Sequence, residues 1–161
     1  MLKKLKESTV TLLHIDHTRF LLQLRDLKDW IPYPGHWGAF GGEIETQESP
    51  EMAGCRELKE ELGYEPEALH YFRDYFLDSN VHLHVFYAEI IVPISEMNLM
   101  EGLDMGLFSL EDIYTLELYS SKVGRNFPVP PLLADFIRDF TLYISSPKVD
   151  QNYSKDRKKI L

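Results

Sequence analysis

The sequence predicts a single α/β domain of the α+β kind, in which strands flank a central helix and a second helix closes the chain. Its 161 residues suffice for one domain with a substantial core, and its hydrophobic fraction of 44% is typical of globular proteins. Segments with strand-like alternation lie on both sides of a segment with helical periodicity. No repeat or linker divides the chain, so we expect one domain over residues 1–145 and a polar, flexible tail over 146–161.

The first part of the chain predicts a β-hairpin followed by a loop. Val10–His14 and Phe20–Leu24 are rich in β-branched and aliphatic residues, and Asp16–Arg19 between them suits a turn. The prolines and glycine of the next segment, RDLKDWIPYPGHWGAF, indicate a loop that leads into a short strand at Trp37–Phe40.

The part that follows residue 64 predicts a second hairpin, a loop and two helices. The expected elements are strands at Leu69–Leu77, Val81–Val92 and Leu107–Phe108, a loop at Pro93–Asp104, a helix after Ser109, and an amphipathic helix from Pro130 to about Tyr143. Residues 78–80 suit a tight turn, and Ser109 with Asp112 matches a capping box. His82 and His84 alternate with apolar residues, so both should face one side, where they either point toward a cleft or simply cover the sheet.

A helix is expected between these two parts. Ser49 can accept a hydrogen bond from the first turn, Pro50 is tolerated there, and Gly63 favours the left-handed conformation that ends many helices. The apolar face expected to pack on the core comprises Cys55, Leu58 and Leu62.

The opposite face of this helix is acidic. At about 100° per residue, Glu57, Glu60 and Glu61 lie together and repel one another by a few tenths of a kcal/mol per pair. An acidic helix face is often only solvated, and Arg56 can serve as a simple i,i+4 partner of Glu60. A divalent cation removes the repulsion, and carboxylate oxygens suit Mg2+ or Mn2+.

The loop before the helix makes the segment more specific. Residues 42–64, GEIETQESPEMAGCRELKEELGY, fit the pattern G-x5-E-x7-R-E-U-x-E-E-x-G-U, where U is a bulky apolar residue. The segment resembles the Nudix box, the signature of the MutT-like Nudix hydrolase superfamily. Tyr64 is the one soft departure, since the family more often has an aliphatic residue there, and an aromatic ring can fill the same apolar slot.

The resemblance implies a mixed β-sheet sandwiched between α-helices. It also implies an enzyme that uses Mg2+ or Mn2+ to hydrolyse a nucleoside diphosphate linked to another group, such as a nucleoside triphosphate, a nucleotide sugar or a dinucleotide. The metal ligands it implies are Glu57, Glu60, Glu61 and the carbonyl of Gly41. The residues it implies for the framework of the box are Gly42, Glu48, Arg56 and Gly63.

The general base is left open by the sequence. Within the box, Glu57 or Glu60 can accept the proton of the attacking water. In other members of the family the base comes from a downstream loop, where Glu101 is the first candidate here and Asp104 the second. Either residue can also be an ordinary surface acid.

Four residues before the box are candidates for substrate binding. Arg25 ends a strand next to the loop that borders the site, and its guanidinium suits phosphate oxygens, although a surface ion pair with a neighbouring aspartate is the alternative. Tyr33, His36 and Trp37 can stack on a nucleobase, and Trp37 can equally belong to the core.

Composition limits the partners. The formal net charge of -9 argues against a nucleic-acid surface, but not against a nucleotide, because a bound metal reverses the local charge. We expect no disulfide from the single cysteine, no membrane span and a cytoplasmic location. A homodimer is left open.

Two other functions compete with hydrolysis. A non-catalytic, nucleotide-binding or regulatory Nudix domain would be expected to have a broken box, whereas this box is complete. An isoprenoid diphosphate isomerase of the same fold needs a catalytic cysteine outside the box helix, and Cys55 lies within that helix.

Overall fold

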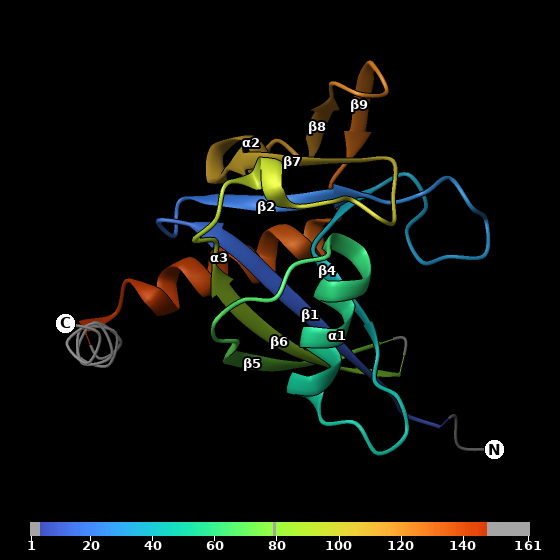
Figure 1. Ribbon diagram of the computed structural model, residues 1–161, viewed down its shortest axis with the longest axis vertical. Helices are drawn as coiled ribbons and strands as arrows, with labels where there is room; N and C mark the ends of the chain where they lie inside the picture. Colours follow the sequence, from blue (N-terminus) through green and yellow to red (C-terminus); the bar gives the residue numbers. More distant parts are fainter. Residues whose placement is uncertain (1–3, 79, 148–161) are drawn as a thin grey trace.

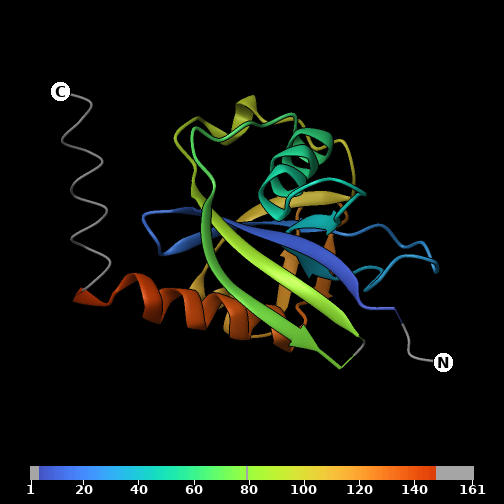
Figure 2. The same cartoon turned by 90° about the horizontal axis from the view of Figure 1, so that it is seen from below.

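The computed structural model describes residues 4–78 and 80–147, and in this part of the chain a mixed β-sheet is sandwiched between helices (Figure 1). The strands of its seven-stranded sheet are β1 (Lys6–Ile15), β2 (Arg19–Leu24), β3 (Trp37–Gly38), β4 (Phe40–Glu43), β5 (His70–Leu77), β6 (Val81–Glu89) and β7 (Asp104–Ser109). Helix α1 (Pro50–Leu62) covers one face of this sheet and α3 (Pro131–Ile144) covers the other (Figure 2). The predicted fold class is confirmed.

The remaining elements are short. They are a 3-10 helix (Ile94–Glu96), α2 (Leu110–Tyr114) and a two-stranded sheet of β8 (Glu117–Ser120) and β9 (Arg125–Pro128). The capping box predicted at Ser109 and Asp112 is confirmed, whereas the β8–β9 hairpin was not predicted. Residue 79 of the expected turn and residues 148–161 of the expected tail lie outside the described residues.

Strand β1 organises the sheet because it pairs with three other strands. On one edge it runs parallel to β6 from Lys6 to His14. On the other edge its residues 8–11 pair with β4 and its residues 13–15 pair with β2, both antiparallel. The sheet therefore divides at Leu12 into a β4 branch and a β2 branch.

The two faces of the sheet carry two hydrophobic clusters. The cluster under α3 contains Trp37, Phe72 and Phe140, and the cluster under α1 contains Leu58 and Tyr64. Tyr64 is buried, so its aromatic ring does occupy the apolar position expected from the sequence.

The predicted apolar face of α1 needs one correction, because Cys55 is exposed. The helix instead meets the sheet at Gly54, where an added methyl group would lie 3.5 Å from the hydroxyl oxygens of both Thr9 and Thr11. Cys55 follows this contact point by one residue, about 100° around the helix, and is therefore turned outward.

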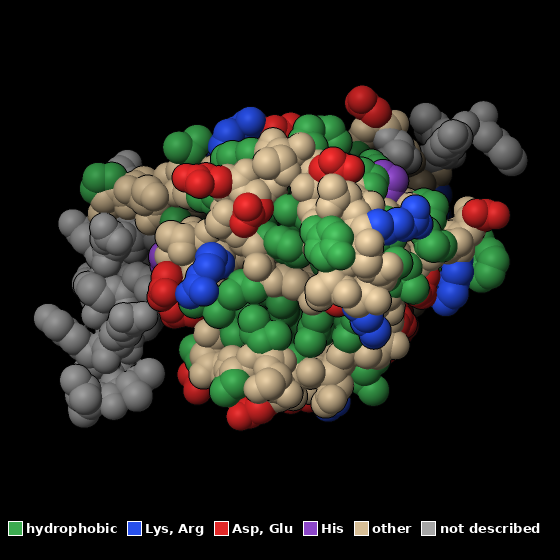
Figure 3. Space-filling model, turned by 90° about the horizontal axis from the view of Figure 1, so that it is seen from above, with side chains coloured by type: hydrophobic (Ala, Val, Ile, Leu, Met, Phe, Trp, Pro, Cys, Tyr) green, Lys and Arg blue, Asp and Glu red, His purple; other side chains and the backbone are tan. Residues whose placement is uncertain are grey.

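None of the helices in the described residues is long and apolar enough to cross a membrane. On the face seen in Figure 3, the Lys and Arg side chains stand apart from one another and do not gather into one basic patch.

The core contains one unusual group, the imidazole of His14 on β1. The residue is fully buried, and neither ring nitrogen has a hydrogen-bond partner among the described residues. The rings of Phe20, Tyr87 and Phe140 surround it at centroid distances of 5.5–6.3 Å. Burial, with smaller contributions from His17 and His70, lowers the pKa of His14 from 6.5 to about 3.

We predict that His14 makes the fold sensitive to acid. In the unfolded chain its imidazole takes up a proton near pH 6.5, whereas in the folded protein it stays neutral down to about pH 3. The contribution of neutral His14 to the free energy of unfolding is therefore complete above the unfolded pKa and is lost as the pH falls toward 3. The loss is about 2 kcal/mol at about pH 5.

Urea unfolding of the wild type and His14→Phe at about pH 7.5 and about pH 5 tests this prediction. The free energy of unfolding should fall less on acidification in the variant than in the wild type. Each protein is compared with itself at the two pH values, so the cost of repacking the new ring cancels. Equal losses in the two proteins would contradict the prediction.

Candidate active site

The acidic helix has the boundaries expected from its capping residues. The Ser49 hydroxyl oxygen accepts the Met52 N–H at 3.1 Å, and α1 begins at Pro50. At the other end Gly63 is left-handed, with φ 61°, and donates its N–H to the Lys59 carbonyl at 2.9 Å. These caps fix which residues of the helix face the sheet.

The paired glycines of β4 bring the strand close to this helix. Gly41 has a φ of 152°, and a Cβ there would overlap the Thr9 carbonyl of β1. A Cβ on Gly42 would overlap the carboxylate of Glu57. A larger residue would push β4 away from β1 at position 41 and would displace the Glu57 carboxylate at position 42, so the pair keeps the strand in the sheet and leaves room for that carboxylate.

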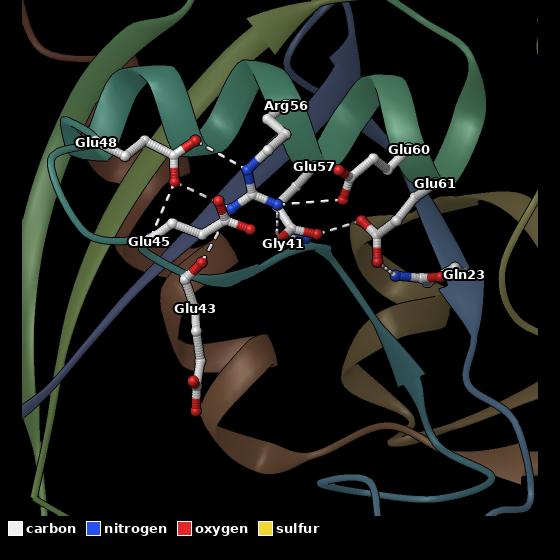
Figure 4. A network of polar contacts seen from close by, with 9 residues as sticks. All are labelled: Gln23, Gly41, Glu43, Glu45, Glu48, Arg56, Glu57, Glu60 and Glu61. Carbon is white, nitrogen blue, oxygen red and sulfur yellow. Dashed lines mark hydrogen bonds and ion pairs between the residues drawn. The ribbon is translucent and has the colours of Figure 1, made fainter.

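A single guanidinium, that of Arg56, links the loop to the helix (Figure 4). Its Nε and Nη2 donate to the two carboxylate oxygens of Glu48 at 2.8 and 3.1 Å, and Nη2 also donates to the Glu43 carbonyl at 3.0 Å. Its Nη1 donates to Glu57 at 2.9 Å and to Glu60 at 3.1 Å. The bidentate pair with Arg56 lowers the pKa of Glu48, so that carboxylate stays ionised.

The Glu61 carboxylate lies at the point where the sheet divides. Its side chain accepts one hydrogen bond from Gln23 Nε2 of β2 at 2.8 Å and one from the Gly41 N–H of β4 at 3.0 Å. Glu61 is only 3% exposed. Burial raises its pKa to about 7, with further increases from the charges of Glu57 and Glu101, although the two hydrogen bonds oppose the shift.

The three carboxylates of the helix differ in their exposure to solvent. Glu61 is buried, the Glu57 side chain is 14% exposed and the Glu60 side chain is 54% exposed. Burial raises the pKa of Glu57, and the charges of Glu60 and Glu101 raise it further against the opposing effect of Arg56. Carboxylate oxygens of different accessibility thus lie along one helix face, each held by a partner within the protein.

The loop that follows β6 packs against the same helix. Its backbone N–H groups at Asn98 and Met100 donate to the carbonyls of Leu62 and Glu61 at 3.0 and 2.8 Å. The exposed Glu101 comes next in the chain, and its charge contributes to the raised pKa of Glu57 and of Glu61. The structure therefore brings this sequence-predicted residue beside the box.

Asp104, the second candidate base, lies elsewhere. It is buried and accepts hydrogen bonds from the Ser120 hydroxyl at 2.6 Å and from the Lys122 N–H at 3.3 Å. Its carboxylate holds the β8–β9 hairpin against β7, which is a structural task.

The four predicted substrate contacts separate into two groups. Arg25 follows β2, two residues after Gln23, and its Nε donates to the Pro32 carbonyl at 2.7 Å. Tyr33 is exposed and its ring meets that of His36 edge to face at 5.7 Å. These three residues belong to one loop beside the end of β2.

Trp37 must be set apart from this group. It is fully buried, and its indole N–H donates to the Leu118 carbonyl at 3.0 Å. The structure supports the alternative in which Trp37 belongs to the core, because its ring packs from β3 against the β8–β9 hairpin. This hairpin was not expected from the sequence.

One residue of the site, Gln23, was missed in the sequence. It is a polar residue within the apolar strand FLLQL, and it is buried with its amide against Glu61. An isolated amide in such a strand is a usable signal, because a buried polar group needs a partner.

Comparison with known proteins places these features in a family. The model of the NUDIX domain matches residues 5–126. A search of curated proteins found no match.

Solved structures of similar fold cover most of the chain. The MutT protein from Methanosarcina mazei Go1 is 22% identical, with a TM-score of 0.68 over 91% of this chain and 99% of that one. The NUDIX domain of Shewanella oneidensis NrtR, solved with ADP ribose, is 17% identical, with a TM-score of 0.67 over 89% of this chain and 91% of that one. The MutT NUDIX hydrolase from Burkholderia pseudomallei is 23% identical, with a TM-score of 0.64 over 85% of this chain and 98% of that one.

The family model spans more than half of the chain, including the whole box and the strands that hold it. Nudix hydrolases generally use divalent metal ions, and this helix presents carboxylates suited to them. The chain belongs to the NUDIX domain family and is a Nudix pyrophosphohydrolase.

Proposed function

We propose that this enzyme uses Mg2+ or Mn2+ to cleave a nucleoside diphosphate linked to another group. The observation that carries the proposal is the acidic face of α1, where Arg56 joins Glu57 and Glu60 to the box loop and Glu61 accepts the N–H of Gly41. An acidic surface alone would repel a phosphate substrate, so the arrangement needs a cation to work.

The donor set fits a hard divalent cation. All the available side-chain donors are carboxylate oxygens, and the Gly41 carbonyl is a further oxygen on the neighbouring strand. The raised pKa values of Glu57 and Glu61 arise from burial together with their negative neighbours, and a positive ion relieves both effects. We assign Glu57, Glu60, Glu61 and the Gly41 carbonyl as the ligands.

A bound cation would screen the charge of the phosphates and lower the pKa of the attacking water. The protein supplies the rest of the chemistry. Arg56 and Glu48 hold the box loop against α1, and Gln23 keeps the Glu61 carboxylate turned toward Gly41. The carboxylates are thereby oriented before the substrate arrives, which lowers the cost of reaching the transition state.

We assign Glu101 as the general base. It is exposed, so a water molecule can reach it, and its loop is fixed to α1 by main-chain hydrogen bonds to the carbonyls of Glu61 and Leu62. Its proximity to Glu57 and Glu61 is evident from its effect on the pKa of both. A base within the box, Glu57 or Glu60, is the competing assignment, although both carboxylates already accept a hydrogen bond from Arg56.

The substrate is proposed to be a small nucleotide that binds along the loop after β2. Arg25 carries the positive charge that a phosphate needs, and Tyr33 offers an exposed ring and His36 a half-buried one for a base or sugar. The NrtR domain solved with ADP ribose supports a ligand of this class, a nucleoside diphosphate with a further group attached. Nucleoside triphosphates, nucleotide sugars and dinucleotides all satisfy this description.

We predict that catalysis requires a divalent cation, since the acidic helix cannot hold a phosphate without one. EDTA should abolish turnover of a nucleotide panel, and Mg2+ or Mn2+ should restore it. Analysis of the released products would also identify the bond that is cleaved. Full turnover by a preparation verified to be free of metal would refute the proposed mechanism.

We predict that Glu60→Gln and Glu61→Gln each lower turnover by about a hundredfold or more, because each removes a charged ligand while keeping the size of the side chain. Metal-free Glu60→Gln should melt at or above the wild-type temperature, since mutual repulsion among the carboxylates is reduced. Glu65→Gln is a matched control, because Glu65 follows the helix and forms an exposed ion pair with Lys59. Near-normal turnover by both site variants would contradict the assignment.

We predict that Glu101→Gln lowers kcat by roughly a hundred- to ten-thousandfold with little change in KM, as expected for the loss of a general base. The acidic limb of the pH–rate profile should disappear in this variant and remain in Glu96→Gln, a change of an exposed acid in the same loop. If Glu101→Gln keeps that limb and Glu57→Gln removes it, the base belongs to the box.

A further inference from the structure

A second cluster of potential metal ligands lies outside the box, on the three adjacent strands β1, β6 and β5. His82 and His84 of β6 are paired in register with Glu7 of β1 and Asp74 of β5, respectively. The two imidazoles project to the same side of β6, as the alternation of the sequence predicts. Glu7 is two residues before Thr9, whose hydroxyl lies near Gly54, so the cluster is on the face covered by α1.

The four side chains of the cluster form a closed ring of contacts. Glu7 lies 3.0 Å from His82 Nδ1 and 2.6 Å from His84 Nε2 through its two carboxylate oxygens. Asp74 lies 2.9 Å from His82 Nε2 and 3.0 Å from His84 Nδ1 in the same way. Every ring nitrogen therefore faces a carboxylate, and each carboxylate spans both rings.

We propose that Glu7, His82 and His84 form a binding site for a divalent transition metal of the Zn2+ type, with Asp74 as the residue that orients the two imidazoles. Each of the three ligands places one donor atom within 4.8 Å of the other two. Donors of one tetrahedral zinc ion lie about 3.3 Å apart, so the atoms need to approach one another by about 1.5 Å at most. The Glu7 side chain, which is 43% exposed, has the freedom to make this adjustment.

The donor chemistry distinguishes this site from the box. Two imidazole nitrogens and one carboxylate oxygen match the ligands that zinc prefers, whereas the box offers only oxygens and suits Mg2+. His82 and His84 are 16% and 12% exposed, so they are largely shielded and yet reachable from solvent. A three-ligand set leaves the fourth position of the metal to water.

Asp74 provides the outer contact that histidine ligands usually have. When one ring nitrogen binds a metal, the other donates its N–H, commonly to a carboxylate that fixes the orientation of the ring. The nitrogens that face Asp74 are the ones that do not face Glu7, in both histidines. Phe76 also stacks on His82, with ring centroids 4.3 Å apart and an interplanar angle of 13°, which restricts the rotation of that imidazole.

The site can be tested by calorimetric titration of Zn2+ alone into the full chain, with excess Mg2+ to occupy the box and at about pH 8 to weaken the competition of protons for the ligands. Wild type should bind one equivalent that is lost, or weakened by at least a hundredfold, in His84→Ala and in Glu7→Gln. Asp74→Asn should keep the stoichiometry and weaken binding by about ten- to a hundredfold, as expected for an orienting contact. His36→Gln, which removes a histidine remote in the fold, should bind Zn2+ as wild type does.

Thermal melts provide a second readout that does not depend on catalytic activity. Zn2+ should raise the wild-type Tm with the logarithm of its concentration above Kd and leave the Tm of His84→Ala unchanged, provided that the metal-free melts show both proteins to be folded. If wild type takes up no equivalent of Zn2+ under excess Mg2+, the cluster is only a set of ion pairs and the proposal is wrong. Unchanged affinity in both His84→Ala and Glu7→Gln would overturn it equally.

Discussion

The active site depends on the contacts made by the guanidinium of Arg56. It connects the backbone of β4 at Glu43, the loop residue Glu48 and the helix residues Glu57 and Glu60 through five donated hydrogen bonds. Without this positive charge the acids of the loop and helix would repel one another. The Arg56 guanidinium thus offsets part of the negative charge of this surface and fixes the positions of the carboxylates that it contacts.

The division of the sheet gives the site its location. Strand β1 pairs with β4 in its first half and with β2 in its second half, so an opening between these two strands is part of the topology. Glu61 fills that opening and is bonded to Gln23 on one side and to Gly41 on the other. A buried carboxylate at a branch point is costly unless it is hydrogen-bonded, and here each branch supplies one donor.

The sequence predicted the local features well because their causes are local. The ends of α1 follow from Ser49 and Gly63, whose effects reach only one turn of helix. The features that it missed or left open depend on residues distant in the chain. Cys55 is exposed because Gly54, its neighbour in the chain, is the residue that meets β1. Trp37 is buried because the β8–β9 hairpin lies over it, and its bond to Leu118 of that hairpin spans more than eighty residues of sequence. Gln23 acquires its role from a helix 38 residues away.

The loop after β6 is attached to the domain through main-chain atoms. Asn98, Met100 and Leu103 each donate a backbone N–H to a carbonyl of α1 or of β2, while the side chains of Asn98, Met100 and Glu101 are exposed. Substitutions at these exposed positions change the surface chemistry of the loop without removing the bonds that fix its path. The loop therefore tolerates a wide range of side chains at these positions while its backbone stays attached to the domain.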